Sequence, residues 1–249
     1  SNSGKIMFVI GVEDLKLKTK KSGNKYFVMR HGEAENNVLD VCSSSLDNTH
    51  HLTEKGKKQT VEATKFLTDK KIDLIFTSPF IRTKETADIV AEMMNLSSQN
   101  IKTDLRLVEL SDGIFDKGSV QKVRDFFKDN NIDKYYGASE GGESLVDVKK
   151  RVGEFIYEVE KEYQNKNILI ITHEDSARAL FSAVNGFDKK ETLNNEKNNF
   201  LLLNAEIREL DFISLPHNEN YELDLHRPYI DKIILVDKDG EEYKRIPEV

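Results

Sequence analysis

The chain contains the stretch Tyr26-Phe27-Val28-Met29-Arg30-His31-Gly32-Glu33, a short apolar run that ends abruptly in an arginine, a histidine and a glycine. The apolar part is typical of a strand buried inside a sheet. Arg30 offers a planar, permanently charged fork for phosphate oxygens, and His31 can serve as nucleophile, base or cation near neutral pH. Gly32 lets the backbone bend sharply and approach a ligand closely. The stretch therefore indicates an anion-handling site at the tip of a buried strand.

Strand patterns alternate with amphipathic helix patterns from residue 25 to residue 212. We expect strands at 25–29, 72–76, within 101–108, at 168–171, 200–203 and 207–212, and helices at 53–69, 78–94, 119–128, 144–163 and 175–184. This alternation predicts an α/β fold, namely a three-layer αβα sandwich in which helices cover both faces of a mainly parallel sheet.

Local signals support the helix assignments. Thr53 is a suitable cap for the first helix. That helix should turn three apolar side chains toward the core: Val61, Phe66 and Leu67. In the second helix, Ser78 is the expected N-cap and Pro79 lies in the first turn. The long helix is predicted from apolar residues at helical spacing: Leu145, Val148, Val152, Phe155, Ile156 and Val159.

The two ends of the chain lack this alternation. Residues 6–10 form a short apolar run, and Asp237-Lys238-Asp239-Gly240 separates two strand-like stretches at 233–236 and 242–246, which predicts a hairpin. We therefore expect one large domain over residues 25–213 and a small β appendage formed by the flanks, residues 1–24 and 214–249.

Composition limits the classes of function. The chain has 249 residues and a net charge of -7, which argues against a broad nucleic-acid-binding surface. The single Cys42 excludes an internal disulfide and a cysteine-built zinc site. No apolar run approaches the roughly 20 residues that span a bilayer. We expect a cytoplasmic protein without membrane contact, metal or cofactor, and we read Ser1-Asn2-Ser3-Gly4 as a cloning remnant rather than a signal peptide.

Five polar residues follow predicted strands or begin the helix after one. Arg30 and His31 end the first strand, Arg82 lies in the helical turn after the second, Glu109 follows the third, and His173 follows the strand at 168–171. Each alone has an ordinary structural or surface interpretation. Because ligands bind at the carboxyl ends of strands in open α/β sheets, we expect these five side chains to converge on one crevice.

These residues stand in motifs that resemble the histidine phosphatase superfamily, in its phosphoglycerate-mutase-like branch. The resemblance covers roughly residues 25–212. It is carried by Arg30-His31-Gly32-Glu33, Leu52-Thr53-Glu54-Lys55-Gly56 with Gln59, Thr77-Ser78-Pro79 with Arg82-Thr83 and Thr86-Ala87, Gly141-Gly142-Glu143-Ser144, and Thr172-His173.

The resemblance implies a role for each residue. His31 would be the nucleophile that forms a phosphohistidine, and Glu109 would protonate the leaving group and then activate water. A set of cationic and polar side chains would bind the phosphoryl oxygens of a small phosphorylated substrate: Arg30, Asn37, Arg82 and His173. We also assign Glu174, the residue after His173, to this phosphate-binding site. We expect a backbone carbonyl to hold the other ring nitrogen of His31, which fixes the attacking tautomer. We also expect the bound phosphate dianion to raise the pKa of Glu109.

Three departures from the family pattern qualify these roles. Ala34 stands where a hydroxyl residue is common, and Glu174 and Asp175 follow the second histidine in place of glycine or alanine. Glu174, beside the anion pocket, would repel substrates or select cationic or hydroxyl-rich ones; alternatively it points to solvent at a helix N-terminus. Residues 110–115 lack the run expected of glycolytic mutases, so a phosphatase is favoured over a mutase. A catalytically idle phosphate-binding or structural module is the third alternative.

The flanks resemble a different family, the isoleucyl-tRNA synthetases. The similarity lies in residues 5–16, in Leu223-Asp224-Leu225-His226-Arg227-Pro228-Tyr229-Ile230-Asp231 and in Lys244-Arg245-Ile246-Pro247-Glu248-Val249. In that family these pieces are near neighbours in sequence, so the resemblance implies a phosphatase domain inserted in a synthetase and expressed as an excised piece. The parent would bind tRNA. This chain has no synthetase catalytic motif, and we expect neither aminoacylation nor direct nucleic-acid binding from it. The alternative is a phosphatase with an ordinary accessory hairpin.

Overall fold

A computed structural model of the protein describes residues 22–185, 187, 189–193 and 201–210, together with the strand residues 233–236 and 242–245. Its strands are β1 Lys25–Arg30, β2 Leu74–Thr77, β3 Ile101–Thr103, β4 Asn167–Thr172, β5 Ile207–Leu210, β6 Ile233–Val236 and β7 Glu242–Arg245. Its α-helices are α2 Glu35–Leu39, α3 Glu54–Thr64, α4 Ile81–Met93, α5 Val120–Asp129, α6 Leu145–Glu162, α7 Glu174–Asn185 and α8 Lys189–Leu193. Short 3₁₀ turns are η1 Lys65–Leu67, η2 Ser98–Asn100, η3 Leu105–Leu107 and η4 Gly113–Phe115.

The central sheet has five strands in the order β3-β2-β4-β1-β5. The first four are parallel, and β5 runs antiparallel to β1 at the edge. In the β1–β4 pair, Met29 lies opposite Ile171 and Arg30 opposite Thr172. The parallel pairing therefore ends at the same level on both strands, just before His31 and His173.

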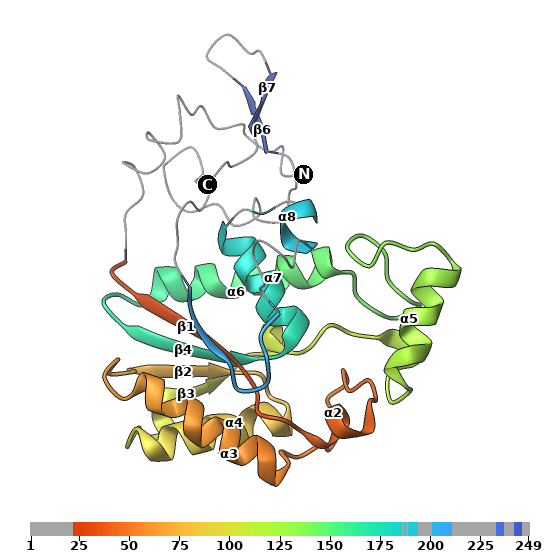
Figure 1. Cartoon of the computed structure of the whole chain (residues 1–249). Helices are drawn as coiled ribbons and strands as arrows, with labels where there is room; N and C mark the ends of the chain where they lie inside the picture. Colours follow the sequence, from red (N-terminus) through yellow and green to blue (C-terminus); the bar gives the residue numbers. More distant parts are fainter. Residues whose placement is uncertain are drawn as a thin grey trace.

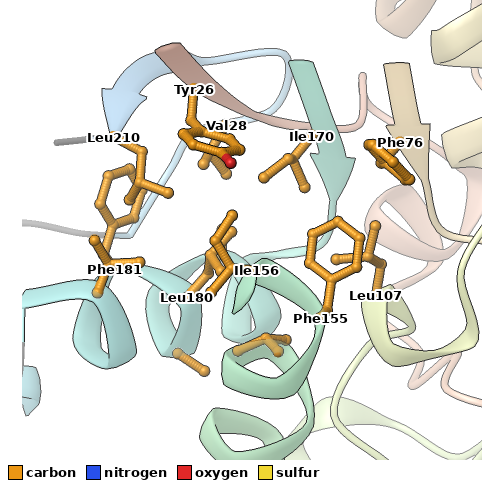
Figure 2. Close-up of a cluster of buried hydrophobic side chains, with 14 of the residues drawn as sticks. Tyr26, Val28, Phe76, Leu107, Phe155, Ile156, Ile170, Leu180, Phe181 and Leu210 are labelled. Carbon is orange, nitrogen blue, oxygen red and sulfur yellow. The ribbon is translucent and has the colours of Figure 1, made fainter. Parts of the chain in front are cut away.

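Helices cover both faces of the sheet, with α3 and α4 on one side and α6 and α7 on the other (Figure 1). Residues of β1 alternate between two buried clusters, because successive side chains in a strand point to opposite faces. Tyr26 and Val28 join the core under α6 and α7 shown in Figure 2, whereas Phe27 and Met29 join the core under α3 and α4. The predicted α/β sandwich with a mainly parallel sheet is confirmed.

The long helix α6 is the most regular part of the prediction that the structure confirms. Ser144 is its N-cap: its hydroxyl accepts a hydrogen bond from the Asp147 backbone N–H, and the Asp147 carboxylate accepts one from the Ser144 N–H in return. All six apolar residues named for this helix are buried.

The helix at 53–69 was only partly predicted correctly. Thr53 does cap α3, with its hydroxyl accepting from the Gly56 N–H at 3.0 Å, and Leu67 is buried. Val61 and Phe66, however, are 41% and 47% exposed. The buried face of α3 is instead made of small residues, Gly56, Thr60 and Thr64, because the helix packs closely on the loop after β1.

Three other expectations need correction. Ser78 does not cap α4, which begins at Ile81 with Phe80 as its N-cap, and the reason lies in the site described below. Residues 201–203 form no strand and Leu203 is exposed; β5 pairs with β1 rather than with them. The short helix α2 lies in a segment predicted as loop, since five residues give no periodic pattern.

The predicted hairpin is present as the antiparallel pair β6–β7, in which Ile233 lies opposite Arg245. The strand expected at residues 6–10 lies outside the described residues. Among the helices of the described segments, none has the length and apolar character needed to cross a bilayer.

Candidate active site

The nucleophile candidate His31 follows β1 directly and is 2% exposed. Its backbone N–H continues the parallel ladder by donating to the Thr172 carbonyl at 3.1 Å. The ring Nδ1 lies 2.7 Å from the Gly32 carbonyl oxygen. A carbonyl can only accept, so Nδ1 carries the proton and Nε2 keeps its lone pair, as expected for an attacking imidazole.

Arg82 connects this ring to the second histidine. Arg82 is 2% exposed, and its guanidinium donates from Nε to His31 Nε2 at 3.2 Å and from Nη2 to His173 Nδ1 at 3.1 Å. It also donates to the hydroxyl and the carbonyl of Ser43, at 3.0 and 2.8 Å. The face of the guanidinium lies over the Phe80 ring, 4.9 Å from its centroid. Burial lowers the pKa of Arg82 to about 10, which leaves it cationic at neutral pH.

His173 follows β4 as His31 follows β1, and it is fully buried. Since Arg82 donates to its Nδ1, the proton of the neutral ring lies on Nε2, which donates to the Ser78 hydroxyl across 2.9 Å. The two imidazole rings meet edge to face with centroids 5.2 Å apart. Ser78 is therefore a partner of His173, which explains why it does not cap α4.

Both histidines are held neutral by their surroundings. Burial lowers the pKa of His31 well below its ordinary value, and the cationic Arg82 and Arg30 lower it further. Burial, followed by Arg82, has the same effect on the pKa of His173. An imidazole that stays neutral down to acidic pH retains the lone pair needed for nucleophilic attack.

Arg30 is the last residue of β1, and its side chain is 14% exposed. Its Nη1 donates to the Leu202 carbonyl at 2.8 Å and forms an ion pair with the Glu174 carboxylate. Its buried Nε has no hydrogen-bond partner within the described part of the chain. The Glu174 side chain is 40% exposed at the start of α7, in keeping with the solvent-facing alternative, but its ion pair with Arg30 also places it beside the candidate site.

Glu109 does not follow β3 directly, because the 3₁₀ turn η3 intervenes. Its carboxylate accepts hydrogen bonds from the backbone N–H of Leu110, at 2.9 Å, and of Glu174, at 3.0 Å. Burial raises the pKa of Glu109 to about 7, with the negative charge of Asp175 as the next cause. A carboxyl group with such a pKa can carry a proton at neutral pH and also release it.

Asp175 forms an ion pair with Lys134 across 2.8 Å. Burial opposes the charge on Asp175, but the ion pair with Lys134 and the charges of Arg178 and Arg30 together outweigh burial, and the pKa of Asp175 is lowered. Asp175 is thus held as an anion near Glu109 and helps to keep Glu109 protonated. It was noted in the sequence only as a departure from the family pattern.

Asn37 lies in α2, beside the loop that carries His31. Its Oδ1 accepts from the Ala34 backbone N–H at 3.0 Å and from Asn204 Nδ2 at 3.3 Å. The same Asn204 nitrogen donates to the His31 carbonyl oxygen at 3.3 Å. Asn204 therefore joins the segment before β5 to the loop after β1, and no pattern in the sequence pointed to it.

The loop that holds Arg82 is itself anchored by Asp116. The Asp116 carboxylate accepts from the N–H and the hydroxyl of Ser44, at 2.7 and 2.9 Å, and from the Ser45 hydroxyl and the Asn48 amide. Ser43, next to Ser44, supplies two of the acceptors of Arg82, its hydroxyl and its carbonyl oxygen. Neither Ser43 nor Asp116 was identified from the sequence.

The structure thus brings the sequence-predicted residues together. His31, Arg82 and His173 form one hydrogen-bonded chain, and residue 174 joins Arg30 through its side chain to Glu109 through its backbone. The arrangement offers a neutral imidazole, two guanidinium groups and a protonatable carboxyl at the carboxyl end of the sheet, the edge where open α/β sheets bind ligands.

The sequence model of the histidine phosphatase superfamily (branch 1) matches residues 26–215. Phosphoserine phosphatase 1 of Hydrogenobacter thermophilus is 32% identical over 168 residues, which cover 66% of this chain and 77% of that protein. The 2,3-bisphosphoglycerate-dependent phosphoglycerate mutase of Bartonella tribocorum is 28% identical over 182 residues, covering 70% and 87%. The structure of Bacillus stearothermophilus YhfR has a TM-score of 0.64 at 22% identity, covering 90% of this chain and 96% of that one, and shares the fold.

Proposed function

This chain belongs to the histidine phosphatase superfamily, and on that premise we propose that it is a phosphomonoester hydrolase that acts through a phosphohistidine on His31. The observation that carries the proposal is the chain of contacts from His31 through Arg82 to His173. It leaves His31 Nε2 unprotonated beside a buried cation. A phosphoryl group needs positioning and charge neutralisation, and these residues supply both.

In the first step, His31 Nε2 attacks phosphorus and the bond from phosphorus to the ester oxygen breaks. The departing oxygen takes the proton of the Glu109 carboxyl group, which gives an alcohol and the phosphohistidine. In the second step, the Glu109 carboxylate takes a proton from water, the water oxygen attacks phosphorus, and the N–P bond breaks. Inorganic phosphate leaves, and His31 and Glu109 regain their starting states.

The remaining residues position the phosphoryl group and balance its charge. Arg82 reaches both histidines and would neutralise charge from the centre of the site, with Arg30 at its exposed side. His173 Nε2–H is engaged by Ser78, which fixes the ring orientation. Asn37 lies on the loop side, and Glu174 contributes through its ion pair with Arg30 and not by direct contact with the phosphoryl oxygens.

The test is hydrolysis of p-nitrophenyl phosphate in the presence of a chelator, with the wild type beside His31→Ala. We expect turnover and an acid-labile phosphoenzyme in the wild type and neither in His31→Ala. Absence of both from a folded wild type would exclude the enzyme and leave the idle binding module. Several relatives are named as mutases, so the second arm supplies 3-phosphoglycerate with 2,3-bisphosphoglycerate. Formation of 2-phosphoglycerate faster than inorganic phosphate would favour a phosphomutase.

We also propose that residues 25–213 are a domain inserted in an isoleucyl-tRNA synthetase, with residues 1–24 and 214–249 as parts of the host. The resemblance of the flanks supports this, and so does the family match, which begins and ends close to those boundaries. The β6–β7 pair lies outside the matched range. Under this proposal tRNA is a ligand of the parent protein and not of residues 25–213.

An antibody against residues 25–213 tests the insertion in extracts of the natural source. We expect a band much heavier than this 249-residue chain, and the same band should react with an antibody against a synthetase catalytic region. A band no heavier than this chain would show that the flanks are an accessory element of a free-standing phosphatase.

A further inference from the structure

Glu174 occupies an unusual position between two parts of the site. Its backbone N–H donates to Glu109 at 3.0 Å, on the side where the leaving group would depart, while its carboxylate forms an ion pair with Arg30, on the phosphoryl side. The side chain is 40% exposed, so a bound molecule can reach it from solvent. Glu174 therefore flanks the region that the organic part of a substrate would occupy.

Arg30 can keep this contact while it binds a phosphoryl group. Its Nη1 holds Glu174 and the Leu202 carbonyl, whereas its buried Nε has no hydrogen-bond partner within the described residues. The guanidinium has five N–H donors, and the contacts to Leu202 and Glu174 use only those of Nη1, so a phosphoryl oxygen can bind another of them without displacing Glu174. The carboxylate would then remain close to the bound substrate.

With a phosphate dianion bound, the positive and negative charges of the described site residues no longer balance. The two guanidinium groups of Arg30 and Arg82 match a phosphate dianion. Asp175 is balanced by Lys134, which contacts it at 2.8 Å, and Glu109 carries a proton in the state that acts as an acid. In the described part of the chain Glu174 pairs with Arg30, whose single charge is then shared with the phosphate, so Arg30, Arg82, Glu174 and the phosphate dianion together carry one net negative charge.

We propose, on the basis of the proposed hydrolase function, that Glu174 is a specificity-determining residue that selects phosphomonoesters bearing an ammonium group on the leaving-group side. An ammonium ion supplies the missing positive charge and donates charge-assisted hydrogen bonds to the carboxylate. A hydroxyl group at the same place donates a hydrogen bond but leaves the repulsion between Glu174 and the phosphate dianion uncompensated.

Two matched substrate pairs test this proposal. O-Phosphoserine and 3-phosphoglycerate differ in an ammonium against a hydroxyl group, and O-phosphoethanolamine and 2-hydroxyethyl phosphate form the same pair without a carboxylate. We expect kcat/KM to favour the amine by roughly tenfold or more in both pairs. In Glu174→Gln the ratio should fall toward one, mainly through loss of the amine substrate, and Glu174→Asp should retain part of the preference.

Glu54→Gln is the matched control, since Glu54 is also the first residue of a helix and also pairs with a cation, Lys57. It should leave both ratios unchanged. Circular dichroism and thermal melting establish that the variants fold.

Two results would overturn this inference and leave the hydrolase function standing. The first is a wild-type kcat/KM ratio of amine to hydroxyl substrate near one, with good turnover of p-nitrophenyl phosphate. The second is an equal rise in kcat/KM for all substrates in Glu174→Gln. The second result would mean that Glu174 competes with phosphate for Arg30 instead of selecting amines. Failure of the folded wild type to hydrolyse any ester, p-nitrophenyl phosphate included, would overturn the hydrolase function and this inference together.

Discussion

Arg82 Nε lies 3.2 Å from His31 Nε2 and donates a hydrogen bond to the nitrogen that would attack phosphorus. In the proposed mechanism this donor turns to a phosphoryl oxygen when the phosphoryl group arrives, because the lone pair is then used in the new bond. The contact therefore marks where the phosphoryl group will sit. It also keeps the nucleophile oriented before substrate binds.

Arg82→Lys should lower kcat/KM for p-nitrophenyl phosphate by roughly 10²–10³-fold, the usual effect of losing a preorganised donor at the reacting centre. Lysine keeps the charge but cannot span His31, His173 and Ser43 with a rigid fork. Arg124→Lys, at an exposed position of α5, serves as control and should keep wild-type activity. Retained activity in Arg82→Lys would show that charge alone suffices.

The pH dependence of kcat/KM should follow the titration of the Glu109 carboxyl group. With its pKa raised to about 7, the protonated form is lost as pH rises through that value, so kcat/KM for an alkyl phosphate should fall on the alkaline side. An alkyl ester is the right substrate, since its leaving oxygen needs the proton. The neutral His31, whose pKa is well below its ordinary value, should add no acidic limb near pH 6.

Asp175→Asn should move this alkaline limb to lower pH. A negative neighbour raises the pKa of a carboxyl group, so its removal lowers the pKa of Glu109; the released Lys134 charge acts in the same direction. Asp88→Asn, on the exposed side of α4, should leave the profile in place. An unshifted limb in Asp175→Asn would mean that another group titrates.

Asp116→Ala should weaken catalysis from a distance. The carboxylate anchors the loop that presents Ser43 to Arg82, and hydrogen bonds to a charged group contribute about 1.5–3 kcal/mol to stability. We expect a drop in kcat of about tenfold with a smaller change in KM, because the geometry of Arg82 matters most in the transition state. Asp88→Ala provides the comparison, and equal kinetics in the two variants would exclude this positioning role.

Gly56→Ala should reduce the free energy of unfolding by about 1–3 kcal/mol or more, the usual cost of overpacking. A Cβ on residue 56 would lie 1.9 Å from the Glu33 carbonyl oxygen and 2.7 Å from the Glu33 nitrogen, both of them backbone atoms. Urea denaturation measures the change, with the exposed Lys58→Ala on the same helix expected to stay within about 0.5 kcal/mol. A Gly56→Ala variant as stable as the wild type would show that α3 can move away from residue 33.

The fold could be predicted where one strong pattern determined an element. The apolar residues of β1 and β4 and the helical spacing along α6 each pointed to a single structure, and their packing agrees. The small-residue face of α3 could not be predicted this way. There, contact with the loop at Glu33 decided which side is buried, and the large side chains Val61 and Phe66 were left outside.

The residues of the candidate site also fall into those that the sequence pattern could identify and those that it could not. Charged residues at strand ends can be found because they interrupt apolar runs, and this identified Arg30, His31 and His173. Ser43 and Ser78 could not be found, since hydroxyl residues are common in loops and only the folded chain brings them to Arg82 and His173. Ser78 was given a helix-capping role because its neighbour Pro79 is typical of a first turn.

The equal level at which β1 and β4 end has a consequence for how this protein can be monitored. Arg30 lies opposite Thr172, and the His31 N–H extends the same ladder. A slip of one residue between the two strands would turn every core side chain of β1 to the wrong face and would also carry His31 out of reach of Arg82. Correct strand pairing and a competent nucleophile are therefore acquired together. Regain of turnover during refolding can serve as a direct clock for formation of the central sheet.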